Sequence, residues 1–123
     1  MNSIKESLLQ EIIDLPSVLE RIGGDESFLQ ELIKIYIEEF QSKLPKLAEA
    51  ITTNDLDAVQ EIAHSLKGSS ANLSLLELQK IAYFLEMASR QGDLKGCQEN
   101  MTKLKLAFEK LINHLPNFSW WKD

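Results

Sequence analysis

Histidine, lysine and glycine at positions 64, 67 and 68 form the group of residues in this sequence best suited to chemistry. An unperturbed imidazole has a pKa of about 6.5, so a histidine side chain is in general mostly neutral at neutral pH and nucleophilic at nitrogen. On a helix, Lys67 lies on the flank of the same surface, where its ammonium can reach a phosphoryl group on the ring. Glycine in an exposed helix costs about 0.8 to 1 kcal/mol relative to alanine. This cost favours access to the ring as the reason for Gly68 and for the small Ala71 on the same side.

No other motif offers a competing chemistry. The sequence has no glycine-rich phosphate loop, no nucleophile elbow and no pair of Glu-x-x-His segments for a carboxylate-bridged metal site. The second histidine, His114, is expected at the surface near a helix end. The lone Cys97 is expected to be a small buried hydrophobe in a reducing compartment, since it has no partner for a disulfide or a metal cluster. Spacing alone leaves a nucleophilic His64 and an ordinary solvated His64 equally open.

The acidic composition argues against nucleic acid as a partner. The formal net charge is -6 and the sequence pI is about 4.9, whereas binding to a phosphate backbone needs a concentrated basic face. The N-terminal stretch carries acidic residues and no cleavage-like pattern, and no apolar run approaches the roughly 20 residues of a membrane span. We therefore expect a cytoplasmic domain that does not contact the membrane.

Apolar residues recur at spacings of three and four along nearly the whole chain, which indicates an all-α fold. Helices are expected from Asp25 to Thr53, from Asp55 to about Asn72, from about Leu75 to Gln91, and from Asp93 or Leu94 to about residue 115. Pro45 is expected to kink or restart the first of these, because proline costs about 3 kcal/mol in a helix interior. Short connections predict an antiparallel up-and-down four-helix bundle over residues 23–115. Residues 1–22 should add one or two short covering helices, with a joint at Leu15-Pro16.

Turn-forming residues mark the breaks between these segments, at Gly23-Gly24, Asn54-Asp55, Leu73-Ser74 and Gly92-Asp93. The tail, residues 116–123, carries Phe118, Trp120 and Trp121 outside the helical pattern. Packing of these aromatics on the bundle is the favoured interpretation, because burial stabilises each by about 1.5 to 3 kcal/mol. A docking patch for a partner is the alternative.

One face of the segment 55–72 is apolar on a helical wheel and forms the expected core face: Leu56, Val59, Ile62, Ala63, Leu66, Ser70 and Leu73. His64 lies about 140 degrees from the centre of this face, so its imidazole should meet solvent. Ser69 and Ser70 are expected to be helix-packing residues rather than ligands.

The run from Ala63 to Leu73, AHSLKGSSANL, resembles the signature of histidine-containing phosphotransfer (HPt) domains, in which the histidine is followed by x-Leu-Lys-Gly-Ser-Ser. The resemblance extends from about Leu15 to Leu111 and includes Gly24-Asp25-Glu26, Asn54-Asp55, Leu85-Glu86 and Arg90-Gln91-Gly92-Asp93. Ser74 departs from the family, which usually has glycine there. A serine at this point is still expected to cap the third helix.

The resemblance implies a four-helix bundle that carries a phosphoryl group between proteins. His64 would take it from the aspartate of a receiver domain, in a response regulator or a hybrid sensor histidine kinase, and donate it to another receiver. The resemblance also implies that the receiver supplies the magnesium ion, so that the chain needs no cofactor of its own and is not an enzyme by itself. A monomer is expected. The alternative is a helical protein-protein interaction module in which the histidine is unused.

The resemblance gives Glu86 a candidate role, because the family often has Glu or Gln at this point of the third helix, facing the histidine. A carboxylate that accepts the Nδ1 proton would fix the tautomer and leave Nε2 as the nucleophile. The alternative is a solvated helix acid paired with Arg90 four residues later, a pair worth at most about 0.5 kcal/mol.

Further residues are candidates for contact with a partner. Three polar side chains around the histidine are possible partner contacts: Gln60, Glu61 and Arg90. Phe28 and Ile35 lie off the main apolar stripe of the first long helix. Cover by residues 4–18 is the favoured explanation for these two, and a receiver-docking surface beside His64 is the alternative.

Overall fold

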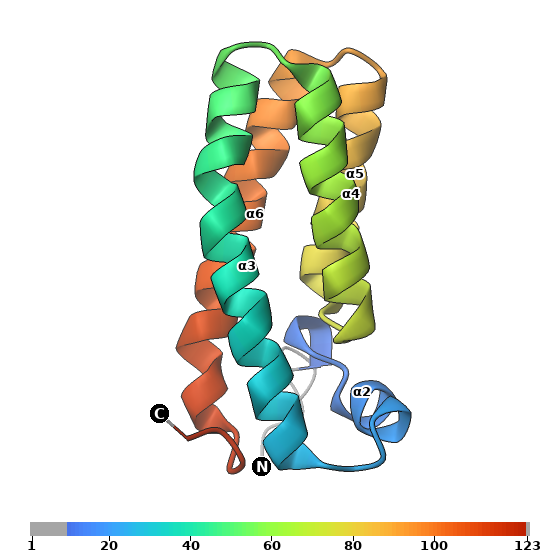
Figure 1. Cartoon of the computed structure of the whole chain (residues 1–123), viewed down its shortest axis with the longest axis vertical. Coiled ribbons are helices and arrows are strands. Elements are labelled where there is room, and N and C mark those ends of the chain that lie inside the picture. Colours follow the sequence, from blue (N-terminus) through green and yellow to red (C-terminus); the bar gives the residue numbers. More distant parts are fainter. Residues whose placement is uncertain (1–9, 123) are drawn as a thin grey trace.

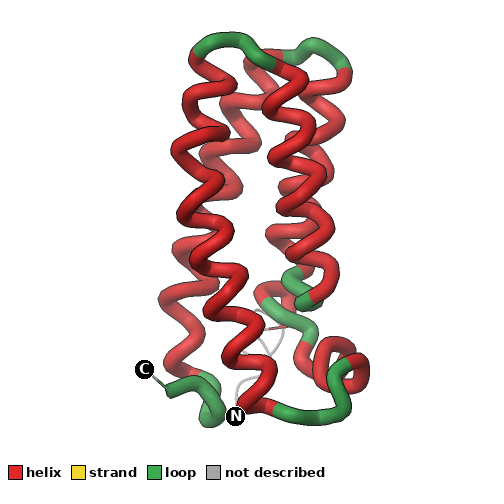
Figure 2. The backbone as a smooth tube through the Cα atoms, viewed as in Figure 1, coloured by secondary structure: helices red, strands yellow, loops and turns green. Residues whose placement is uncertain are grey.

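A computed structural model describes residues 10–122 of the chain and confirms the all-α fold class. In this part of the chain Figure 2 shows helices and loops and no strand. The helices are α2 (Leu15–Arg21), α3 (Glu26–Thr52), α4 (Leu56–Asn72), α5 (Leu76–Arg90) and α6 (Leu94–His114), followed by the short 3-10 helix η1 (Leu115–Asn117). No helix within residues 10–122 combines the length and the apolar character that a membrane span requires.

The four long helices run alternately up and down and form the expected antiparallel bundle (Figure 1). Around the bundle α3 packs on α4, α4 on α5, α5 on α6, and α6 on α3. Because α3 and α6 are the longest helices, they extend beyond α4 and α5 at the lower end of Figure 1, and α2 lies beside that extension. The remainder of the predicted N-terminal cover, residues 1–9, lies outside the described residues.

The turns fall where the sequence predicts them. Aspartates 25, 55 and 93 are the N-caps of α3, α4 and α6, and each side chain accepts a hydrogen bond from a backbone N–H three residues later. Such a bond satisfies a donor that the first turn of a helix leaves unpaired. Asn54 adopts a φ of 56°, in the left-handed region that asparagine tolerates better than most residues. These local signals fix the length of α4 and with it the position of His64.

Pro45 does not restart α3, contrary to the expectation, because one helix runs from Glu26 through Thr52. Phe40 and Leu47 are buried on either side of it and keep this stretch on the core. Pro45 itself is exposed, as is Gln41, whose carbonyl loses its usual helical donor. Water can hydrate that carbonyl, so the tertiary contacts outweigh the cost of the proline.

Ser74 does not cap α5, which is a second correction. The N-cap is Leu75, without a side-chain hydrogen bond, and Ser74 adopts a left-handed φ of 54° at the end of α4. The serine hydroxyl is held by the guanidinium of Arg21 and lies 3.3 Å from the hydroxyl of Ser17. These contacts from α2 compensate for the conformation that a glycine would adopt without strain.

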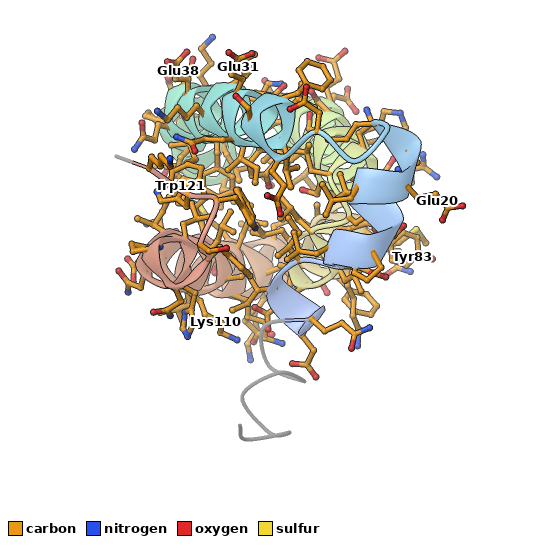
Figure 3. The ribbon with its side chains drawn as sticks, turned by 90° about the horizontal axis from the view of Figure 1, so that it is seen from below. Glu20, Glu31, Glu38, Tyr83, Lys110 and Trp121 are labelled. Atoms are coloured by element: carbon orange, nitrogen blue, oxygen red, sulfur yellow. The ribbon has the colours of Figure 1, made fainter. Side chains whose placement is uncertain are left out.

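The core lies between the four long helices and includes Trp120 of the tail, with Phe118 and Trp121 partly buried against it. Viewed from the end, side chains fill the space between the helices, while Glu31 and Glu38 on α3 point outward (Figure 3). Phe40 and Phe108 stack across the core with ring centroids 3.9 Å apart. Trp120 is buried and stacks on Phe118, so the favoured interpretation of the tail aromatics is confirmed.

Phe28 and Ile35 are not covered as expected. Their exposed fractions are 43% and 62%, so the described part of the proposed cover, residues 10–18, leaves both on the surface. Residues 4–9 of that proposed cover lie outside the described residues.

Candidate functional site

His64 lies at the middle of α4 and faces solvent. The predicted core face is found: Val59, Ala63, Leu66, Ser70 and Leu73 are buried, and Leu56 and Ile62 are half-buried. The His64 side chain is 67% exposed. The helical period of α4 therefore places an accessible imidazole on the face opposite the core.

Glu86 connects this exposed ring to the interior. It lies on α5, is 2% exposed, and its Oε2 is 3.0 Å from Nδ1 of His64. With the proton on Nδ1, the ring donates to the carboxylate and keeps a lone pair on Nε2. The predicted orienting role depends on this contact, and the role itself stays a prediction. The alternative, a solvent-exposed acid paired with Arg90, is wrong about exposure, because Glu86 is buried. The expected pair with Arg90 is present.

The Glu86 carboxylate binds two cations as well as the imidazole. Lys67 Nζ lies 2.7 Å from Oε1, and an Arg90 guanidinium nitrogen lies 3.0 Å from Oε2. Burial of an ionised carboxylate is strongly unfavourable unless charged partners compensate it. We therefore interpret the two cations as the partners that keep a charge beneath the ring. The spacing of the sequence did not indicate the pair between Lys67 and Glu86.

The environment of Glu86 favours its ionised form. The hydrogen bond from Lys67 is the largest influence and lowers the pKa of the carboxyl group, and the contacts with His64 and Arg90 act in the same direction. Burial opposes them, since it disfavours the charged form, but the net shift of the pKa is downward. At neutral pH the carboxyl group is therefore ionised and can accept a hydrogen bond from Nδ1–H.

Tyr83 completes the α5 side of the site. Lys67 Nζ lies 5.8 Å from the centroid of its ring, within the range of a cation–π contact. Tyr83 was not among the residues predicted from the sequence. The signal was available in its spacing, because Tyr83 is three residues before Glu86 and so lies on the same side of α5.

Gly68 leaves open space beside His64. A Cβ added at this position would meet no atom within 4 Å, so packing does not explain the absence of a side chain. Ala71, whose small side chain is predicted to leave room on the same surface, is half-buried. The clearance on which the predicted access role depends is present.

The opposite flank of α4 faces α3 and carries a different set of contacts. Lys43 donates to Glu39 at 2.7 Å and to the hydroxyl of Ser65 at 2.5 Å. Ser69 donates to the carbonyl of Ser65, and the buried Ser70 lies 2.8 Å from the hydroxyl of Tyr36. These hydroxyls serve packing within and between helices, as expected for Ser69 and Ser70.

Glu86 and its three partners, His64, Lys67 and Arg90, form the carboxylate cluster, and none of the other candidate residues in the described part of the chain forms a hydrogen bond or ion pair with the Glu86 carboxylate. Gln60 is half-buried and Glu61 exposed on α4. His114 is the last residue of α6, is half-buried, and bonds through Nδ1 to the carbonyl of Lys110 at 2.8 Å. Cys97 is buried as expected, and burial raises the pKa of its thiol. Within residues 10–122 no three His, Cys, Asp or Glu side chains are grouped as a metal site would require.

Comparison with known proteins identifies the family. Residues 31–114, well over half of the chain, match the Hpt domain family. The chain belongs to this family. The matched range contains all of α4 and α5 and hence every residue of the carboxylate cluster. No solved structure matches the chain significantly.

Named relatives of this Hpt domain agree with the assignment. Multistep phosphorelay regulator 1 of Schizosaccharomyces pombe is 29% identical over 103 residues, which are 76% of this chain and 35% of the relative. Phosphorelay protein LuxU of Vibrio vulnificus is 29% identical over 79 residues, 64% of this chain and 67% of LuxU. Chemotaxis protein CheA of Borreliella burgdorferi is 37% identical over 65 residues, 46% of this chain and 8% of CheA. The chain thus spans about a third of the first of these proteins. The family and the first two names support a phosphotransfer carrier of two-component relays.

Proposed function

We propose that this Hpt domain carries a phosphoryl group on Nε2 of His64, taking it from the aspartate of one receiver domain and giving it to the aspartate of another. One observation carries the proposal. An imidazole that is 67% exposed has its Nδ1 3.0 Å from a buried carboxylate, an arrangement that favours a proton on Nδ1 and a lone pair on Nε2.

The transfer balances without an external acid or base. The Nε2 lone pair attacks the phosphorus of the aspartyl phosphate, an N–P bond forms, and the P–O bond to the aspartate breaks with its electron pair leaving on the carboxylate. The ring, still protonated at Nδ1, now carries a positive charge, which the adjacent Glu86 carboxylate stabilises. In donation, a second aspartate attacks phosphorus and the N–P electron pair returns to Nε2.

Charge and clearance around the ring fit this step. A phosphoryl group brings negative charge to a surface whose nearby cations, Lys67 and Arg90, are held on Glu86. The open space at Gly68 gives a receiver room to bring its aspartate in line with Nε2. Lys67 is thus the proposed phosphate-stabilising residue, and Gly68 and Ala71 the residues that keep the approach open.

The partners and setting follow from the same proposal. Receiver domains of response regulators, or of a hybrid sensor histidine kinase, would be donor and acceptor, with Gln60, Glu61 and Arg90 as candidate contacts. The magnesium ion would come from the receiver, and the domain would act as a cytoplasmic monomer without catalysis of its own. A helical interaction module that leaves the histidine unused is not supported by any feature of the family or the site.

The proposal is tested by incubating the chain with a phosphorylated receiver and following label on the chain. The wild type should gain phosphate that is stable to base and labile to acid, and His64→Gln should gain none. His114→Gln is the matched control and should be labelled like the wild type. Acid-labile label of wild-type amount on the His64 variant would refute the assignment.

A further inference from the structure

Tyr83 holds a position beside the site that its packing does not explain. Its side chain is 45% exposed, and Figure 3 shows it at the periphery of the bundle. We propose that Tyr83 is a positioning residue, which keeps the Lys67 ammonium beside His64 by a cation–π contact. The inference rests on the proposed function, because the proposed role of Tyr83 is to assist phosphoryl transfer at His64.

The ammonium of Lys67 lies close to the imidazole of His64. His64 Nδ1 lies 3.0 Å from Oε2 of Glu86, and Lys67 Nζ lies 2.7 Å from Oε1 of the same carboxylate. Because the two oxygens belong to one group, the cation and the ring are neighbours. The lysine side chain has a flexible stem, and other rotamers would take the charge into solvent.

The aromatic ring of Tyr83 lies near this ammonium. The centroid of Tyr83 lies 5.8 Å from Lys67 Nζ, and Tyr83 is three residues before Glu86 on α5. The face of an aromatic ring attracts a cation without accepting its protons. Tyr83 can therefore hold Lys67 near the site while leaving its N–H groups available to a phosphoryl oxygen.

The neighbouring residue, Phe84, differs from Tyr83 in its contact with lysine. Phe84 is also 45% exposed, and its ring centroid is 5.6 Å from that of Tyr83. Within the described residues a lysine lies over the ring of Tyr83 and none over that of Phe84. The two residues thus share exposure and helix but differ in the contact with Lys67, which makes Phe84 a matched control.

The experiment measures the rate constant of transfer from a phosphorylated receiver to His64, and the lifetime of the resulting phosphohistidine, in single-residue variants. Tyr83→Leu should slow transfer about two- to fivefold, the range expected for an exposed cation–π contact. Tyr83→Phe keeps the aromatic face and should restore the wild-type rate. Phe84→Leu should have no effect.

A double variant separates action through Lys67 from direct contact with the receiver. In a Lys67→Met background, Tyr83→Leu should change neither rate nor lifetime, because the cation it positions is gone. Any one of three results would overturn the inference and leave the proposed function intact. Tyr83→Leu could slow transfer equally in the Lys67→Met background, Phe84→Leu could slow transfer as much as Tyr83→Leu, or Tyr83→Leu could transfer at the wild-type rate. Absence of label on the wild-type His64 would instead refute the proposed function, on which the inference depends.

Discussion

An ion pair of the same kind lies on each side of α4, in two different settings. On the α5 side Lys67 and Glu86 are 2.7 Å apart, and on the α3 side Lys43 and Glu39 are also 2.7 Å apart. Glu86 is 2% exposed and also binds His64, whereas the Glu39 side chain is 30% exposed and its pair joins two residues of one helix. Distance does not distinguish these pairs. The burial of Glu86 and its contact with the imidazole do distinguish them, and on these grounds we propose chemistry for the α5 side and packing for the α3 side.

Removal of the carboxylate on each side of α4 should give the largest difference in transfer rate between the two sides. Glu86→Ala leaves Nδ1 of His64 without its acceptor, and a hydrogen bond to a charged group contributes about 1.5 to 3 kcal/mol. We expect transfer to slow by about 10- to 100-fold. Glu39→Ala removes a half-buried pair that does not contact the imidazole and should change the rate less than about twofold. Equal rates for the two variants, measured with one phosphorylated receiver, would remove the distinction between the flanks.

Removal of the lysines should show the same contrast at a smaller scale. The sequence pattern alone predicts that Lys67→Ala changes the free energy of unfolding by no more than about 0.5 kcal/mol, as for an ordinary surface residue. The contact with a buried carboxylate raises the expected loss to about 1 kcal/mol, with transfer slowed about tenfold. Lys43→Ala should stay within about 0.5 kcal/mol at an unchanged rate. Denaturant unfolding and transfer assays on the pair of variants check both values.

The two helical glycines with right-handed φ should respond in opposite directions. Gly68→Gln should raise the free energy of unfolding by about 0.5 kcal/mol through helix propensity, yet slow transfer severalfold by obstructing the receiver. At Gly96 a Cβ would lie 3.2 Å from Cβ of Ala88 and would crowd the capping side chain of Asp93, so Gly96→Ala should lower stability. Transfer at the wild-type rate by a folded Gly68→Gln variant would show that clearance is not the reason for that glycine.

Acid should produce the smallest effect. The pKa of Glu86 is lowered in the folded chain, chiefly by the hydrogen bond from Lys67, relative to about 4.3 in an unfolded chain. Its contribution to stability is therefore complete above the unfolded value and is lost as pH falls through the folded value. The difference in unfolding free energy between the wild type and Glu86→Gln should shrink between pH 6 and pH 3. A constant difference would show that the ionised form contributes nothing.

Local signals explain why most of the fold could be predicted. Aspartate caps and the apolar period predict the helix ends to within one or two residues. The same period predicts the relative positions of His64, Lys67 and Gly68, because all three lie on one helix. Pro45 was misjudged because its cost is offset by distant core contacts.

Other features depend on the packing of helices against one another. The pair between Lys67 and Glu86 requires the register of α4 against α5, which no single segment specifies. The conformation of Ser74 depends on Arg21, more than fifty residues away along the chain. The resemblance to the HPt family named Glu86 and its contact with His64, and the sequence spacing named Arg90 as a partner, but the burial of Glu86 and its pair with Lys67 came from the structure.

Nitrogen NMR of the His64 imidazole tests the central claim most directly, namely that Glu86 selects the reactive nitrogen. In the unphosphorylated chain the neutral ring should carry its proton on Nδ1, and in the phosphorylated chain the phosphorus should couple to Nε2. Glu86→Ala should lose the preference for the Nδ1–H tautomer. A proton on Nε2 in the wild type, or a phosphoryl group on Nδ1, would contradict the account.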